Sequence, residues 1–177
     1  MTDTNQDPGA PPPFRFTRES RIRIDRDGHV WHEGEKVAHE KLARALASWV
    51  AIDPETDRYV LRNPLDWCFI TVDDAPLVVR SVRIHDGARF EVELSDGSVE
   101  PLDLATIRID ADDVPYCEVR QGTLPARFSR SAAFTLLEHA DAEGDRIVFP
   151  TANGSVTVKR VGRGEGAPQR EPAHPDS

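Results

Sequence analysis

Three arginines, Arg120, Arg127 and Arg130, surround the predicted start of a helix. The first N–H groups of a helix have no partner within the helix, and its positive dipole end favours an anion. If these side chains converge with Ser129 and Ser131, they would clamp a phosphate or a carboxylate. If they face outward, they are ordinary surface arginines. The sequence leaves both alternatives open, and the clamp is its leading candidate site.

Three aromatic residues, Trp31, Tyr59 and Trp67, are spread over predicted strands near the first predicted helix, at about residues 40–50. Aromatic side chains of this kind usually fill a core, but one that lined a crevice would stack on a flat ligand. Asp73 and Asp74 follow a predicted strand. Because consecutive residues leaving a strand point to opposite sides, we interpret them as turn formers and not as a catalytic carboxylate pair.

Metal-binding and catalytic patterns fail on their spacing. Asp53-x-Glu55-x-Asp57 resembles the opening of a calcium loop, yet it lacks the glycine and the final glutamate that an EF-hand needs. His29 and His32 lack an obvious third and fourth ligand. The sequence contains no nucleophile elbow, no Gly-rich phosphate loop and no His-Glu-x-x-His pattern. We therefore expect no metal, no cofactor and no enzymatic activity.

The elements that would position these residues occur twice. Residues 34–60 and 122–148 align without a gap, and Gly34 falls on Gly122 and Ala38 on Ala126. Each copy reads as an amphipathic helix, an acidic turn and a strand, a pattern typical of duplicated units that pack on each other. The helices are predicted from about Glu40 to Val50, and from a Ser129 cap to about His139.

The rest of the chain alternates polar and apolar residues between Asp-Gly and Asn-Gly turns, which predicts hairpins. The predicted class is α+β, mostly antiparallel strands with two helices in equivalent positions. We expect an N-terminal repeat domain over residues 15–76 and a C-terminal one over residues 77–161. Residues 1–14 and 162–177 are rich in proline and poor in apolar side chains, so we predict disordered tails there.

Composition restricts the partners. The chain has 177 residues and a formal net charge of −9, and residues 50–114 hold fifteen Asp or Glu against six Arg. Nucleic-acid binding is disfavoured because it needs a dominant basic face. No apolar run is long enough for a membrane span, so we expect no membrane partner and a cytoplasmic location. Cys68 and Cys117 lie in apolar stretches and are expected to be buried thiols.

Five short motifs follow one another along the chain: Ile24-x-x-Asp27-Gly28-x-x-Trp31-x-x-Gly34, Asn63-Pro64, Val72-Asp73-Asp74-Ala75-Pro76, Pro115-Tyr116-x-x-Val119-Arg120 and Arg130-x-x-x-Phe134-x-Leu136-x-Glu138. In their order and spacing they resemble a bacterial family known as domain of unknown function 1285 (DUF1285). The resemblance covers about residues 20–160. Trp67 and Ala133-Phe134 depart from the family pattern, which has a basic residue and an aromatic pair at these places.

The resemblance implies a duplicated core whose C-terminal part is pleckstrin-homology-like. It also implies a nucleotide-like ligand between the two halves and a part in bacterial signalling. On this chain it points to Arg120 and Arg130, with Asp74 and Trp31 nearby.

Two functions follow as hypotheses. The first is a cytoplasmic, non-enzymatic regulatory protein that binds a small anionic ligand, such as a nucleotide-like molecule, in the seam between its repeats. Arg120, Arg127, Ser129 and Arg130 would hold the anion. The alternative is a protein-interaction module that offers a sheet edge or a groove to a protein partner.

Overall fold

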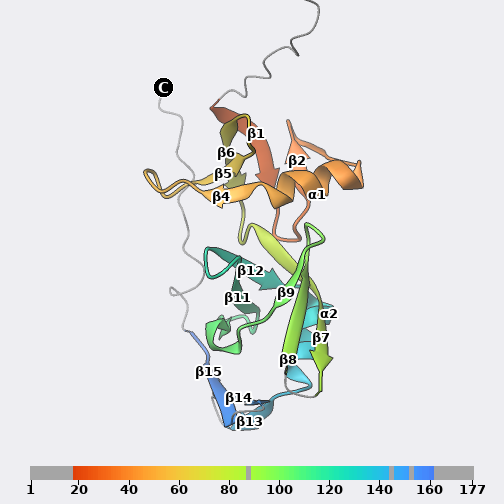
Figure 1. Cartoon of the computed structure of the whole chain (residues 1–177), viewed down its shortest axis with the longest axis vertical. Helices are drawn as coiled ribbons and strands as arrows, with labels where there is room; N and C mark the ends of the chain where they lie inside the picture. Colours follow the sequence, from red (N-terminus) through yellow and green to blue (C-terminus); the bar gives the residue numbers. More distant parts are fainter. Residues whose placement is uncertain (1–17, 87–88, 144–145, 152–153, 162–177) are drawn as a thin grey trace, which may run out of the picture.

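In the described residues three sheets follow one another along the long axis of the molecule, and one α-helix lies beside each of the first two (Figure 1). This computed structural model describes residues 18–86, 89–143, 146–151 and 154–161. The predicted tails, residues 1–14 and 162–177, lie outside the described residues. The class is mixed α+β, as predicted, with far more strand than helix. No helix in the described residues is long and apolar enough to cross a membrane.

The first sheet and its helix come from the N-terminal part of the chain. Its strand order is β3-β2-β1-β6-β5-β4. The elements are β1 (Glu19–Ile24), β2 (Val30–His32), β3 (Glu35–Lys36), α1 (Glu40–Ser48), β4 (Val50–Ile52), β5 (Tyr59–Arg62) and β6 (Trp67–Val72).

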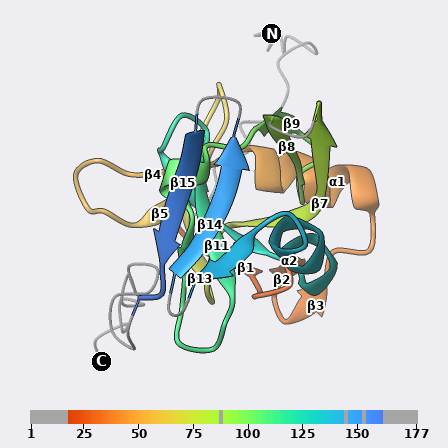
Figure 2. The ribbon, with the colours of Figure 1, turned by 90° about the horizontal axis from the view of Figure 1, so that it is seen from below.

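The second sheet has the order β10-β11-β12-β7-β8-β9, and the third has the order β13-β14-β15. Their elements are β7 (Leu77–His85), β8 (Arg89–Leu94), β9 (Val99–Pro101), the 3₁₀ turn η1 (Leu104–Thr106), β10 (Arg108–Ile109), β11 (Pro115–Val119), β12 (Leu124–Phe128), α2 (Arg130–Leu137), β13 (Asp141–Glu143), β14 (Arg146–Thr151) and β15 (Gly154–Lys159). Figures 1 and 2 place the first and third sheets at opposite ends, with the second sheet between them.

The first helix is shorter than predicted. We expected α1 to reach Val50, but it ends at Ser48, and Val50 pairs with Leu61 in β4 and β5. Apolar Val50 fits the helical stripe and a buried strand equally well, and strand pairing decides between them. The second helix begins as predicted, because the Ser129 hydroxyl accepts the N–H of Ala132.

The chain runs twice through the same order of elements. The first unit, Glu19–Val72, reads β1-β2-β3-α1-β4-β5-β6, and the second unit, Arg108–Lys159, reads β10-β11-β12-α2-β13-β14-β15. In the first unit β1 pairs in parallel with β6, and Ile24 faces Val72. Beside the second unit, Ile109 of β10 forms a parallel bridge with Arg160, just after β15. The two units therefore share both their order and their closing contact.

Corresponding turns also use the same hydrogen bonds. Asp25 N donates to His29 O, and Asp110 N donates to Val114 O, each at 3.0 Å. In both turns the first aspartate carboxylate accepts the backbone N–H groups two and four residues later. Such Asx geometry fixes a tight turn without help from the rest of the fold.

The second unit carries an addition that the first unit lacks. Strands β7, β8 and β9 extend the second sheet, and β7 pairs in parallel with the outer edge of β12. The sheets are mostly antiparallel, as predicted, but the β1–β6 and β7–β12 pairs are parallel. Both parallel pairs join strands that are far apart in the sequence, which the local alternation pattern could not indicate.

Candidate functional site

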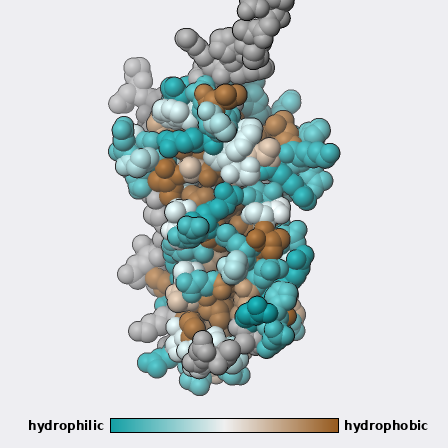
Figure 3. Space-filling model, viewed as in Figure 1, coloured by the Kyte–Doolittle hydropathy of each residue, from teal (hydrophilic) through white to brown (hydrophobic). Residues whose placement is uncertain are grey.

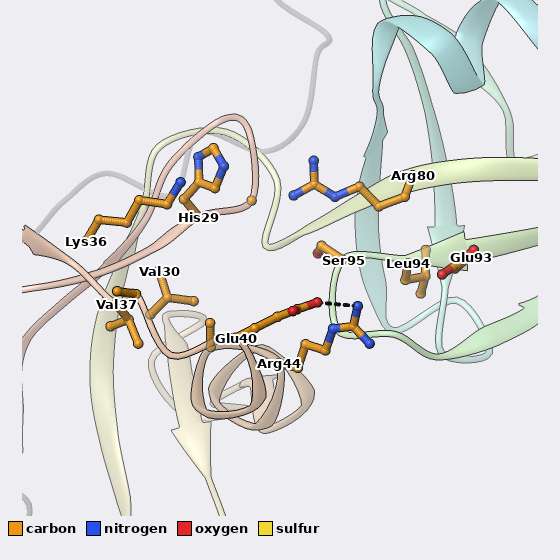
Figure 4. Close-up of a pocket in the computed structure, with 13 residues that line it drawn as sticks. His29, Val30, Lys36, Val37, Glu40, Arg44, Arg80, Glu93, Leu94 and Ser95 are labelled. Carbon is orange, nitrogen blue, oxygen red and sulfur yellow. Dashed lines mark ion pairs between the residues drawn. The ribbon is translucent and has the colours of Figure 1, made fainter.

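A pocket of about 380 Å³ lies where the first sheet and α1 meet β7 and β8 of the second sheet (Figure 4). Its volume falls within the range of small-ligand sites, about 300–1,000 Å³. The lining residues are Gly28, His29, Val30, Lys36, Val37, Ala38, Glu40, Ala43, Arg44, Arg80, Glu93, Leu94 and Ser95. The pocket thus lies between the first unit and the β7–β8 addition, a boundary that is called the seam below.

Basic groups reach this pocket from several elements. Lys36 comes from β3 and Arg80 from β7, and in Figure 4 their side chains and that of His29 point into the same space. Arg44 lies along the α1 side, where its guanidinium pairs with Glu40 at 2.6 Å. Lys36, Arg44 and Arg80 against Glu40 and Glu93 leave the lining positive, in a chain whose net charge is −9.

The turn between β1 and β2 holds His29 in place. The Asp25 carboxylate accepts the His29 N–H at 2.8 Å and lies 3.2 Å from His29 Nδ1. It also accepts the indole N–H of Trp31 at 2.8 Å. Partial burial of Asp25 works to raise its pKa, but these hydrogen bonds outweigh it and lower the pKa. The carboxylate therefore stays ionised and fixes the imidazole at the pocket rim.

Contacts across the seam keep the two walls together. Arg80 Nη2 donates to Asp27 O at 2.8 Å, so the same guanidinium lines the pocket and binds the β1–β2 turn. Gly28 has φ +75°, and a Cβ there would come within 2.9 Å of Val78 Cγ2. A Cβ on Gly97, after β8, would approach an Arg44 guanidinium nitrogen at 3.2 Å. Glycine is needed where these turns touch the opposite wall.

Arg120 lies at the same seam but outside the pocket lining. Its guanidinium pairs with Asp96, whose side chain is only 2% exposed, and donates to Ser48 O at the end of α1 at 3.4 Å. Its backbone N–H donates to Glu100 Oε1 at 2.9 Å. Arg120 therefore ties α1 to the β8–β9 turn, and its charge is already matched by a protein carboxylate.

Arg127 and Arg120 do not converge. Tyr116 faces Arg127 across β11 and β12, whereas Arg120 follows the other end of β11. Arg120 lies four residue steps beyond Tyr116, which places the two arginine backbones about 13 Å apart along the hairpin. The three arginines therefore do not form the single cluster that a clamp would need. Arg120 and Arg127 are close in sequence, but they lie at opposite ends of the β11–β12 hairpin.

Arg127 instead belongs to a half-buried cluster with Asp74. Arg127 Nε lies 2.9 Å from Asp74 Oδ2, and Tyr116 OH donates to the same carboxylate at 3.0 Å. Burial, followed by the Asp74 charge, raises the pKa of Tyr116 to about 12. Asp73 pairs with Arg23 at 3.0 Å, so the two neighbouring aspartates do point to different partners.

The remaining predicted residues also lie outside the pocket lining. Ser129 caps α2 and lies 3.4 Å from Arg80 O, while Arg130 is exposed at the first position of the helix. Trp31 is half-buried, binds Asp25 and lies beneath Arg23, whose guanidinium carbon is 5.5 Å from the ring centroid. None of these three side chains faces the space that Lys36 and Arg80 share.

Sequence reasoning did not single out Lys36, Arg44 and Arg80, which line the pocket. The sequence indicated only that Arg44 would be accessible, because it lies off the buried face of the predicted helix. Lys36 and Arg80 come from different sheets, and no local pattern joins them. Gly28 and Val78 approach each other closely at the same boundary, and no local pattern indicates that approach either.

Residues 11–75 match the sequence model described as "Domain of unknown function (DUF1285), N-terminal domain". A DUF1285 family protein from Silicibacter pomeroyi DSS-3 has a similar crystal structure, with a TM-score of 0.65 and 20% identity over 87% of this chain and 88% of that one. A second, from Shewanella baltica OS155, has a TM-score of 0.58 and 22% identity over 69% of this chain and 94% of that one. No curated protein matches this chain. The resemblance found in the sequence is therefore confirmed: residues 11–75 match the N-terminal domain model of DUF1285, and the fold is similar to those of two bacterial DUF1285 family proteins.

Proposed function

We propose that this protein binds a small anionic ligand in the pocket between the first sheet and the β7–β8 wall. The observation that carries the proposal is the meeting of Lys36, Arg80 and His29, from three separate elements, around one open space. An acidic protein gains little from gathering cations there unless an anion occupies the space.

The proposal keeps the function expected from the sequence and changes the residues. Lys36 and Arg80 would neutralise the anion, and Ser95, which lines the same space, would donate a hydrogen bond. Arg120 and Arg127 would hold the seam in shape, because each already pairs with a carboxylate. The role is regulatory and non-enzymatic, in the cytoplasm, and a nucleotide-like ligand is one candidate. A pleckstrin-homology-like C-terminal part belongs to the same proposal.

A thermal-shift panel tests this function. Purified protein would be heated with phosphate, pyrophosphate, mononucleotides and cyclic dinucleotides. A ligand at a hundred times its dissociation constant stabilises the fold by about 2.7 kcal/mol, which gives a readily measured rise in melting temperature.

Matched variants locate the site. Lys36→Gln and Arg80→Gln should abolish the shift caused by any anion that binds. Lys41→Gln, in α1, and Arg89→Gln, in β8, remove exposed cations that lie outside the lining, and they should preserve the shift. If no anion in the panel stabilises the protein, or if both variant pairs behave alike, the proposal fails.

A further inference from the structure

The pocket borders a stretch of backbone whose counterpart in the second unit is paired with another strand. The gapless alignment places Ala38 on Ala126. In the second unit β12 continues through Ala126 to Phe128, and these residues pair in parallel with Leu77, Val78 and Val79 of β7. Ala126 is fully buried as a result.

In the first unit the corresponding strand stops early. β3 ends at Lys36. Val37 N still donates to Val30 O of β2 at 2.8 Å, and His39 O accepts the Ala43 N–H of α1, but in the described part of the chain no strand pairs with the outer edge of this segment, the edge that faces away from β2. His39 is still extended, with φ −78° and ψ 103°. Ala38 is exposed, in contrast to buried Ala126. The outer edge of this backbone is thus extended as in a strand, but none of the described strands covers it.

Val37 and Ala38 line the same pocket as Lys36 and Arg80. The open space therefore lies beside Val37 and Ala38. In the second unit the corresponding part of β12 pairs with β7. Backbone hydrogen bonds along such an edge give affinity to an extended peptide, and side-chain pockets give specificity.

The chemistry of the lining restricts the peptide. Lys36, Arg44 and Arg80 favour carboxylates, while Val30, Ala43 and Leu94 offer apolar surface. Side chains of an extended strand alternate between two sides. A segment that alternates acidic and apolar residues would meet both surfaces at once.

We propose that the ligand of this pocket is a short acidic peptide segment, which adds as a strand parallel to Val37–His39. The proposal rests on the anion site described above and narrows its ligand class. The parallel direction of the peptide is inferred from the β7–β12 pair, in which β7 of the same chain occupies the corresponding edge of β12.

Other exposed features give weaker candidates. The exposed large hydrophobics Leu42, Leu65, Val99 and Phe134 come from four different elements or turns. On the face shown in Figure 3, hydrophobic residues form separate patches between hydrophilic ones. These separate patches do not form one continuous apolar surface on this face.

Calorimetric titration with acetyl-Asp-Val-Asp-Val-Asp-amide tests the proposal. We expect binding that is lost in Lys36→Gln and preserved in Lys41→Gln, and no binding of the matching peptide with lysine in place of aspartate. Two further peptides carry N-methyl groups, one on both valines and the other on the aspartates. Successive N–H groups of a strand point to opposite edges, so one analogue should bind about tenfold more weakly or worse, and the other should bind normally.

Pyrophosphate, titrated in parallel, separates the two proposals. If pyrophosphate binds in a Lys36-dependent way and the acidic peptide does not, the anion site stands and the peptide proposal is overturned. Equal binding of both methylated analogues would also overturn strand addition. If neither pyrophosphate nor the peptide binds, the anion site itself is wrong.

Discussion

Arg120 and Asp96 form an ion pair in which the carboxylate is almost completely buried, and the same guanidinium reaches Ser48 O at the end of α1. Removing one partner of a buried pair leaves an uncompensated charge, which typically costs about 3–5 kcal/mol. We therefore expect Arg120→Met to lower the free energy of unfolding by about 3 kcal/mol. Chemical denaturation measures this change.

Arg130→Met is the control for that variant. Arg130 is exposed at the first position of α2, where a positive charge opposes the helix dipole. Its removal should change stability by less than about 0.5 kcal/mol. Equal losses in the two variants would contradict the structural role of Arg120.

Gly28 tests the seam itself. Both Gly28 and Gly34 have positive φ, so alanine at either position is strained by about 1–2 kcal/mol. Only at Gly28 would the new Cβ meet another atom closely, Val78 Cγ2 at 2.9 Å. Gly28→Ala should cost at least about 1 kcal/mol more than Gly34→Ala in thermal or denaturant unfolding. Equal costs would mean that the turn does not press against β7.

Tyr116 gives the protein an alkaline limit. Its pKa is raised to about 12, mainly by burial and then by Asp74, from a usual value near 10. A raised folded pKa stabilises the fold fully below the unfolded pKa, and this contribution falls as pH rises from about 10 to about 12. Unfolding midpoints between pH 9 and pH 12 should therefore decline more steeply in the wild type than in Tyr116→Phe. Parallel curves would contradict this assignment.

The two cysteines should be unreactive in the folded protein. Cys68 and Cys117 are fully buried and free, and burial raises the pKa of both thiols, that of Cys117 to about 12. Because the thiolate is the reactive form, an aromatic disulfide reagent at pH 8 should label neither residue until denaturant is added. Rapid labelling of Cys68 in native protein would show that β6 opens readily.

Much of the fold could be predicted because its signals are local. Asp-Gly and Asn-Gly turns marked hairpins, and Ser129 marked the start of α2. Gly34 and Gly122 occupy the same position in the two aligned copies. Each lies in a turn and has a positive φ. Backbone geometry of this kind depends on a few neighbouring residues and leaves a trace in the sequence.

The candidate site could be predicted only in part, because it depends on long-range packing. The sequence placed the expected ligand at a seam between the two halves, but two of the arginines chosen from their closeness in sequence are paired elsewhere, Arg120 with Asp96 and Arg127 with Asp74. Lys36 and Arg80 line the same pocket because the chain leaves the first sheet after β6 and continues as β7, which pairs with β12 in the second sheet. A parallel pair between distant segments has no local sequence pattern.

Calorimetric titration of pyrophosphate tests the central claim most directly. The wild type would be compared with a Lys36→Gln, Arg80→Gln double variant and with a Lys41→Gln, Arg89→Gln control of equal net charge. The anion site predicts saturable binding by the wild type and the control, weakened by added salt, and a loss of at least about tenfold in affinity in the pocket variant. Equal affinity in all three proteins, or no binding to any, would contradict the claim that this pocket is an anion site.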